Sequence, residues 1–150
     1  MTQISSELDI RVGVDIVQVE RLIRLLDDHA DAAETLFTER ELAYCSGKRH
    51  RDDHLAARFA AKEAVFKACG TGQAPRMRWT DVEVVNEAGE RPRLVLHGEV
   101  AAVVNRQGLD QWDVSLSHAG GIAIAQVIAV GGSQSELRTA KSGPRMSKET

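Results

Sequence analysis

The stretch Asp52–Gly72, DDHLAARFAAKEAVFKACGTG, predicts one long helix around which the rest of the chain is organised. Two aspartates at its start suit the positive end of the helix dipole, and strong helix formers fill most of the interior. Gly70 stands where a helix can end on a left-handed residue. We therefore expect a helix over residues 52–69.

This expected helix is apolar around much of its girth, yet it carries an acid and a base. Leu55, Phe59 and Phe66 share one face, and alanines form a second face beside it. Glu63 and Lys67, spaced i,i+4, fall at the border between the two faces. They form either a surface ion pair of roughly 0.2–0.5 kcal/mol or a partly buried acid and base that face a ligand.

Length and composition limit the class of protein. A chain of 150 residues with 43% hydrophobic content suits a single domain with a real core. The net charge of −3 gives no argument for nucleic acid. Cys45 and Cys69 lack metal or redox spacing and are expected to be free thiols. With neither a signal peptide nor a membrane span in view, we expect a cytoplasmic protein.

The chain before the long helix predicts a strand and two short helices. Residues 1–9 are polar and expected to fray, and residues 11–19 predict a buried strand with Asp15 in its middle. Asp is depleted in strands, so Asp15 is either an aspartate at a bend or a carboxylate placed for a cation or a proton. Residues 20–29 predict a helix with Leu25 among its inward leucines. Thr38 opens the second helix with a capping box.

The chain after the long helix predicts two hairpins and a helix between them. The expected elements are strands at 79–86 and 93–97, a helix at 99–106, strands at 113–118 and 122–130, and a disordered tail at 131–150. The predicted fold is α+β, with a mostly antiparallel sheet packed on the central helix in one domain over residues 10–130.

Four segments together are similar to a known family. GVDIVQVERL at 13–22, RFAAKEAVFKACGTG at 58–72, WTDVEVVNEAGERP at 79–92 and VSLSHAGGIAIAQVI at 114–128 resemble the 4′-phosphopantetheinyl transferase superfamily. They match its small holo-acyl-carrier-protein synthase class. Larger members carry D-x-E at the first motif, whereas this chain has Asp15-Ile16-Val17. The resemblance implies a homotrimer with active sites between subunits, which makes physical sense because one small lobe cannot enclose coenzyme A alone.

The resemblance also implies a reaction and a metal. The phosphopantetheine arm of coenzyme A would move to a serine of an apo acyl carrier protein of fatty-acid or polyketide synthesis, leaving 3′,5′-ADP. Asp15 and Glu63 match the ligands of Mg²⁺, with Mn²⁺ as a substitute, and Lys67 matches the group that neutralises or protonates the leaving phosphate. The serine proton would go to a metal-bound water or to one of the two carboxylates. A hydrolase of coenzyme A or nucleotide pyrophosphates and a non-catalytic binding module are the alternatives.

Substrate contacts are implied by the same likeness. The positions that match the surroundings of the coenzyme A phosphates are Lys48, Arg58, Lys62, Gly70, Thr71, Gly72, Ser117 and His118. Arg21 and Arg24 match the basic helix that docks the acidic helix of the carrier protein. From composition alone these two arginines would be a solvated face. The run 48–51 would be either a solvated loop or a site that holds phosphates.

Overall fold

The computed structural model describes residues 7–132, and it has two antiparallel sheets arranged with five α-helices. The larger sheet has the strand order β1-β5-β4, and the smaller one pairs β2 with β3. The strands are β1 (Asp9–Gln18), β2 (Val82–Val85), β3 (Arg93–Leu96), β4 (Leu109–Ala119) and β5 (Ile122–Gly131). The helices are α1 (Val19–Asp28), α2 (Ala32–Leu36), α3 (Glu39–Ser46), α4 (Arg51–Cys69) and α5 (Gly98–Arg106), with a 3-10 turn η1 (Trp79–Asp81) before β2.

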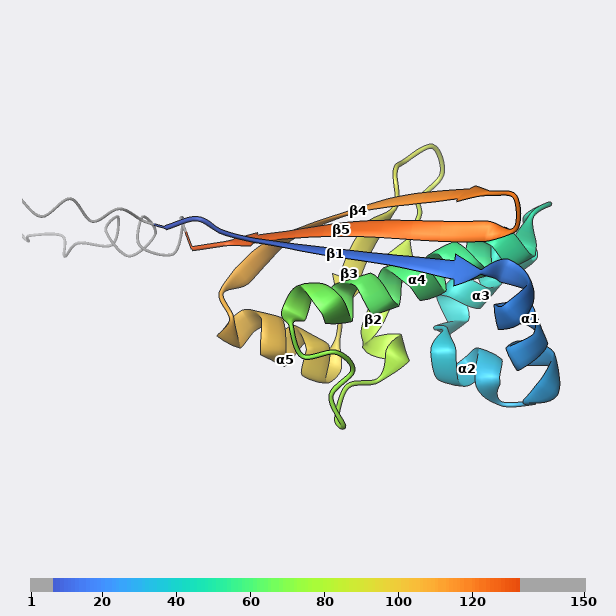
Figure 1. The fold of residues 1–150 in the computed structure, drawn as a ribbon, viewed down its shortest axis with the longest axis horizontal. Coiled ribbons are helices and arrows are strands. Elements are labelled where there is room, and N and C mark those ends of the chain that lie inside the picture. The colour runs from blue at the N-terminus through green and yellow to red at the C-terminus, as the bar shows by residue number, and fades with distance from the viewer. Residues whose placement is uncertain (1–6, 133–150) are drawn as a thin grey trace, which may run out of the picture.

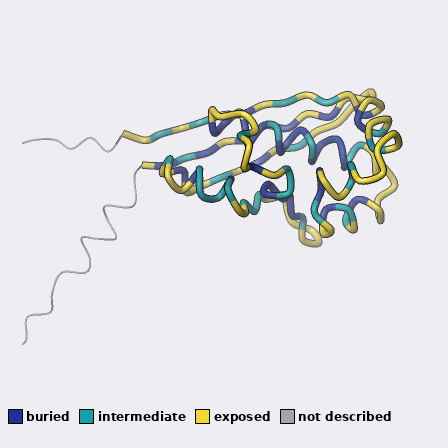
Figure 2. The backbone as a smooth tube through the Cα atoms, turned by 90° about the horizontal axis from the view of Figure 1, so that it is seen from below, coloured by how far each residue is buried: buried dark blue, intermediate teal, exposed yellow. Residues whose placement is uncertain are grey.

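The larger sheet and α4 form two layers. In Figure 1 the strands β4, β5 and β1 run side by side with α4 against one face, while α1, α2 and α3 gather at the end where β1 stops. Side chains alternate along the strands, so one face of the sheet meets α4 and the other faces outward. Figure 2 shows the buried residues gathered between the strands and helices and the exposed ones along the loops.

The core lies around α4. Leu55, Val65 and Phe66 are fully buried on the helix, and burying such a side chain contributes about 1.5–3 kcal/mol. Alanines on both α4 and β5 are also buried, which lets the helix lie close to the sheet. The two free thiols, Cys45 and Cys69, are buried too.

Local chemistry placed most boundaries correctly. Thr38 and Glu41 form the reciprocal capping box of α3, and Gly70 ends α4 with φ of 74°. The predicted helix 20–29 is α1, although Leu25 is exposed rather than inward. Within residues 7–132, no helix combines the length and the apolar character that crossing a bilayer requires.

Some boundaries differ from the sequence expectations. The helix α2 was not predicted, and the first three residues of the expected strand 79–86 form η1 instead. Asp9, expected to fray, begins β1, and Gly131, expected in the tail, ends β5 because the two residues pair across the sheet. The rest of the predicted tail, residues 133–150, and residues 1–6 lie outside the described part of the chain.

Candidate active site

Asp15 and Lys67 meet where β1 crosses α4. The ammonium of Lys67 lies 2.8 Å from Asp15 Oδ1 and also donates a hydrogen bond of 3.0 Å to the carbonyl of Val14. Only 17% of the Asp15 side chain is exposed, against 52% of the Lys67 side chain. The pair therefore stands at the rim of the strand–helix contact, with the base open to solvent.

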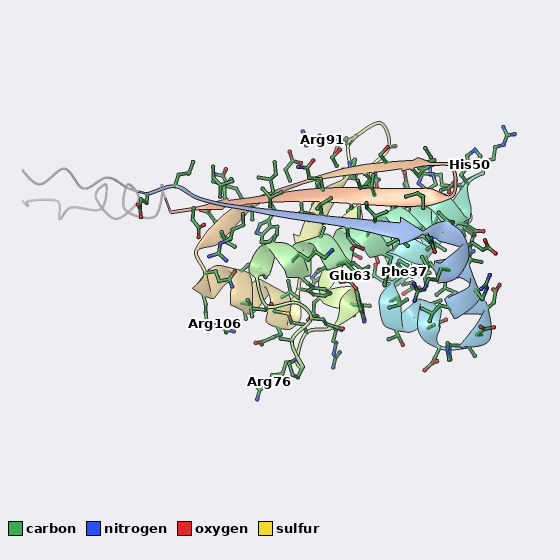
Figure 3. All side chains as sticks on the ribbon, in the orientation of Figure 1. Phe37, His50, Glu63, Arg76, Arg91 and Arg106 are labelled. Carbon is green, nitrogen blue, oxygen red and sulfur yellow. The ribbon has the colours of Figure 1, made fainter. Side chains whose placement is uncertain are left out.

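Glu63 lies one turn before Lys67 on α4, near the middle of the molecule (Figure 3). Burial raises the pKa of the Glu63 carboxyl, and the negative charge of Asp15 raises it further, while Lys67 partly offsets both. Within residues 7–132, Lys67 forms its ion pair with Asp15 and not with Glu63, so the simple helical pair is not what the fold makes. Two carboxylates and one ammonium instead share a small region.

This donor set is sparse for a metal site made by protein alone. In the described residues, 7–132, no group of three or more His, Cys, Asp or Glu side chains is arranged to hold a metal ion. Two neighbouring carboxylates nevertheless suit a hard cation that takes its other oxygens from water and phosphate. Burial raises the pKa of Glu63 and the charge of Asp15 raises it further, and a bound cation would offset both effects.

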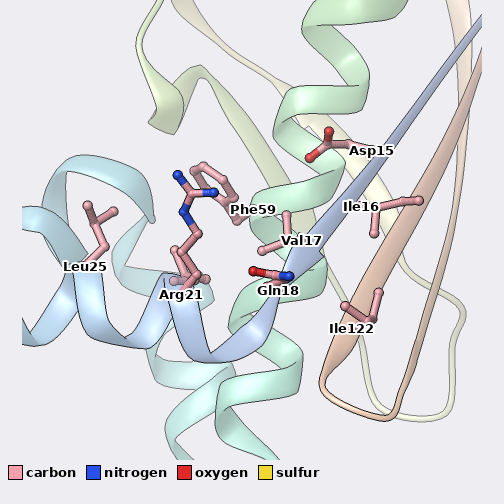
Figure 4. Close-up of a pocket in the computed structure, with 9 residues that line it drawn as sticks. Asp15, Ile16, Val17, Gln18, Arg21, Leu25, Phe59 and Ile122 are labelled. Carbon is pink, nitrogen blue, oxygen red and sulfur yellow. The ribbon is translucent and has the colours of Figure 1, made fainter.

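A groove adjoins Asp15 along the side of α1. Its volume is about 610 Å³, and Asp15, Arg21, Leu25 and Phe59 are among its lining residues (Figure 4). A second hollow of about 420 Å³ continues past Arg21 and Arg24 to the turn between β4 and β5. Arg24 is exposed and bonds Glu20 at 2.9 Å. The groove combines an apolar wall with a basic rim.

A second cluster of polar groups lies around the start of α4. The ring of Tyr44 stands between Lys48 Nζ at 4.6 Å and the Arg58 guanidinium carbon at 4.3 Å. Arg58 is buried, donates 2.6 Å to the side chain of Asn86, and leaves its Nε without a partner among residues 7–132. Two of the residues predicted to bind coenzyme A, Lys48 and Arg58, therefore place positive charge at this end of α4.

Histidines complete that cluster. The rings of His50 and His54 lie 6.4 and 6.0 Å from the ring of His118, and His50 and His118 both approach Asp53 Oδ2, at 3.8 and 3.6 Å. Sequence reasoning selected His118, considered His50 only as part of the basic run 48–51, and did not consider His54. The available signal was that His54 follows His50 by one helical turn. Burial lowers the pKa of His54, and Arg58 lowers it further.

The other predicted coenzyme A residues are placed apart from this cluster. Gly70, Thr71 and Gly72 follow the opposite end of α4. Ser117 pairs with Ile124 and so takes the outward face of the sheet, whereas His118 takes the inward face. Lys62 is fully buried beside Glu41 and does not reach a surface where a phosphate could bind. One copy of the chain thus brings together only part of the predicted set.

The comparisons agree with the motifs. The model of the 4′-phosphopantetheinyl transferase superfamily matches residues 11–127. Holo-[acyl-carrier-protein] synthase of Streptomyces coelicolor is 49% identical over 122 residues, which cover 81% of this chain and 98% of that protein. The synthase of Geobacter sulfurreducens is 45% identical over 117 residues, which cover 77% and 93%.

Solved structures give the same answer. The Chronobacterium ammoniagenes ACPS–CoA complex superposes with a TM-score of 0.72 at 30% identity, covering 81% of this chain and 96% of that one. Sequence and fold therefore agree over nearly the whole length of the relatives. The chain belongs to the 4′-phosphopantetheinyl transferase superfamily.

Proposed function

We propose that this protein is a holo-acyl-carrier-protein synthase, which moves 4′-phosphopantetheine from coenzyme A to a serine of an apo acyl carrier protein. The observation that carries the proposal is the meeting of Asp15, Glu63 and Lys67 at the contact of β1 and α4. Relatives at 45–49% identity bear the name of that enzyme, and a structural relative is a complex with coenzyme A.

The chemistry explains why these residue types are needed. The serine oxygen bonds to the β-phosphorus while the bond from that phosphorus to the oxygen of 3′,5′-ADP breaks. Negative charge grows on the phosphoryl oxygens and on the leaving phosphate, so catalysis depends on positioning and electrostatic stabilisation. The exposed ammonium of Lys67, held by Asp15, suits the neutralisation or protonation of the leaving phosphate.

Asp15 and Glu63 would hold a magnesium ion, with manganese as a substitute. The fit rests on two adjacent carboxylates whose like charges are costly without a cation. When bound, the ion would supply positive charge that stabilises the negative charge developing on the pyrophosphate. The remaining ligands would be water and the substrate.

Arg21 and Arg24 would dock the carrier protein. Both are exposed on α1, and both line the hollow beside the groove that reaches Asp15. An acidic helix placed against α1 would bring its serine toward that groove, and the exposed side chain of Leu25 offers an apolar contact there. Docking would thus depend on charge at the rim and on apolar contact within.

The enzyme would work as a homotrimer with sites between subunits. The outward face of the larger sheet is apolar, with exposed large side chains at Ile10, Val12, Val14, Ile16, Ile122, Ile124 and Ile128. A monomer rarely exposes so continuous an apolar surface, so a second copy is the natural cover.

The separation of the predicted ligands supports the same arrangement. Gly70 lies twelve residues beyond Arg58 on one helix, which is about 18 Å along its axis. A site between copies would let one chain supply Asp15, Glu63 and Lys67 and its neighbour supply the basic end of α4. The two buried free thiols are compatible with the reducing cytoplasm, where we expect the enzyme to act.

The proposal is tested by weighing an apo acyl carrier protein after incubation with the purified protein, coenzyme A and Mg²⁺. We expect the intact mass to gain one phosphopantetheine unit, and we expect EDTA to prevent the gain. Several carriers must be tried because docking is selective. Breakdown of coenzyme A without any modified carrier would contradict the transferase and favour the hydrolase, and no reaction at all would favour a binding module.

A further inference from the structure

The strand β1 touches α4 backbone to backbone at Gly13. A Cβ atom built on Gly13 would lie 1.8 Å from the carbonyl oxygen of Ala64, 2.7 Å from its carbonyl carbon and 3.1 Å from the amide nitrogen of Ala68. Real Cβ atoms essentially never come within 3.0 Å of a non-bonded heavy atom, so something would have to shift. Because the obstacle is main chain, trimming a neighbouring side chain would not make room.

Asp15 is the next residue of β1 that faces α4. Side chains alternate along a strand, so residues 13 and 15 share the inward face, where they pair with Val127 and Ala125 of β5. On the helix, Ala64 follows Glu63 directly and precedes Lys67 by three residues. Along β1, the close contact at Gly13 is therefore about 7 Å from the backbone of Asp15. On α4, the contact lies on the turn that carries Glu63 and Lys67.

From this geometry we infer that Gly13 is a positioning residue for the active site: the absent side chain sets the spacing of β1 and α4 that puts Asp15 beside Glu63 and Lys67. The inference rests on the proposed function, because it concerns the same three groups. The hydrogen bond from Lys67 to the Val14 carbonyl, at 3.0 Å, depends on that spacing as well. Any larger residue at 13 must push the strand away by more than 1 Å.

A change in the register of β1 would not relieve the clash at residue 13 without displacing Asp15. A shift of one residue would turn the inward face outward and carry Asp15 to the apolar outer surface. A displacement of about 1 Å at a catalytic group can cost about 10²-fold in rate. Gly13→Ala should therefore affect the site as well as the stability of the fold.

Gly131 provides a matched control. It is buried on β5, pairs with Asp9, and would place a Cβ 2.0 Å from the carbonyl oxygen of Gly108. Gly131→Ala thus makes the same kind of backbone clash in the same sheet. Asp9 and Asp15 are six residues apart on β1, so the control clash lies about 20 Å from the site.

The experiment compares Gly13→Ala with Gly131→Ala in the full chain. We would measure unfolding by urea, binding of Mn²⁺ in the presence of coenzyme A by water proton relaxation, and kcat and KM at a temperature where both variants are folded. Both should lose stability, but only Gly13→Ala should weaken Mn²⁺ binding by tenfold or more and lower kcat by about 10²-fold, with KM for the carrier little changed. Equal Mn²⁺ affinity and kcat in the two variants would overturn the inference.

A second variant keeps the test sharp if Gly13→Ala fails to fold. Asp15→Glu adds one methylene to a partly exposed side chain. If Gly13 fixes the distance between β1 and α4, the longer side chain cannot place its carboxylate where that of Asp15 lies. We expect Asp15→Glu to lose both Mn²⁺ affinity and kcat, and full retention of both would overturn the inference. A wild-type protein that binds Mn²⁺ with coenzyme A but modifies no carrier would refute the proposed function, while the Mn²⁺ comparison would still decide the role of Gly13.

Discussion

Lys62 Nζ lies 2.9 Å from a carboxylate oxygen of Glu41, and neither side chain is exposed. The ammonium also donates to the carbonyls of Trp79, at 3.1 Å, and Val82. Glu41 in turn accepts a bond of 2.8 Å from the amide of Val84. Lys62, which directly precedes Glu63 in the chain, therefore ties α4 to α3 and to the segment that leads into β2.

Lys62→Met should destabilise the protein by about 3–5 kcal/mol, because it leaves the charge of Glu41 buried without a partner. The measurement is urea unfolding, with Lys48→Met as the control since Lys48 is exposed. Burial lowers the pKa of Lys62, while the charge of Glu41 and its hydrogen bond oppose the change. Unchanged stability together with a raised KM for coenzyme A would instead show that Lys62 binds substrate.

Glu63→Gln should stabilise the metal-free protein at neutral pH while it abolishes transfer. The pKa of Glu63 is raised in the fold by burial and by Asp15, so the folded state binds its proton more tightly than the unfolded chain. Stability is therefore lost as pH rises through the folded pKa. Urea unfolding in EDTA between roughly pH 4 and 8 should show the wild type losing stability relative to Glu63→Gln as the pH increases.

The control for that series is Glu90→Gln, which changes an exposed carboxylate in the hairpin turn. The stability of Glu90→Gln should equal that of the wild type at every pH. A Glu63→Gln protein that is less stable than the wild type without metal would mean that Glu63 belongs to a structural ion network.

His54 should make the protein sensitive to acid. Burial lowers its pKa, and Arg58, His118 and Lys48 lower it further against the opposing charge of Asp53. The unfolded chain then binds the proton more tightly, so stability falls as pH drops through the unfolded value of about 6.5. His54→Gln should reduce the pH dependence of the melting temperature between about pH 7 and 5.

An exposed histidine serves as the comparison. His29 lies between α1 and α2, and His29→Gln should leave the pH dependence of the melting temperature unchanged. If both variants behave alike, the acid sensitivity does not come from the cluster at the start of α4.

Ile16→Glu should convert the proposed trimer to monomers and remove activity. Ile16 is the most exposed of the large apolar side chains on the outer face, and a buried charge at an interface is costly. Light scattering after size exclusion gives the mass. Asn105→Glu adds the same charge to an exposed position on α5 and should leave the mass unchanged; a wild type that elutes as a monomer would contradict the assembly.

Much of the fold follows from local chemistry. The capping box at Thr38 and the left-handed Gly70 fix two helix ends from a few residues each. The two hairpins were predicted from apolar runs separated by turn residues. The first strand and α1 were misplaced by only a residue or two. By contrast, η1 and α2 are short, so their patterns span too few residues to be distinguished from loops.

The site was predictable only in part, for a physical reason. The family resemblance singled out Asp15, Glu63 and Lys67 together, but the exposure of each lysine depends on residues far away in the sequence. Lys62 is buried because Glu41, on another helix, provides its counter-charge, and nothing near residue 62 reveals this. In the same way, the outward position of Ser117 follows from its pairing with Ile124.

The most direct measurement of the central claim is the transfer rate of Asp15→Asn, read by the intact mass of the carrier. We predict a fall of at least roughly 10²-fold, with the mass by light scattering unchanged from that of the wild type, because the amide neither holds a cation nor pairs with Lys67 as a charge. Normal turnover by Asp15→Asn would contradict the assignment of the active site to this contact of β1 and α4.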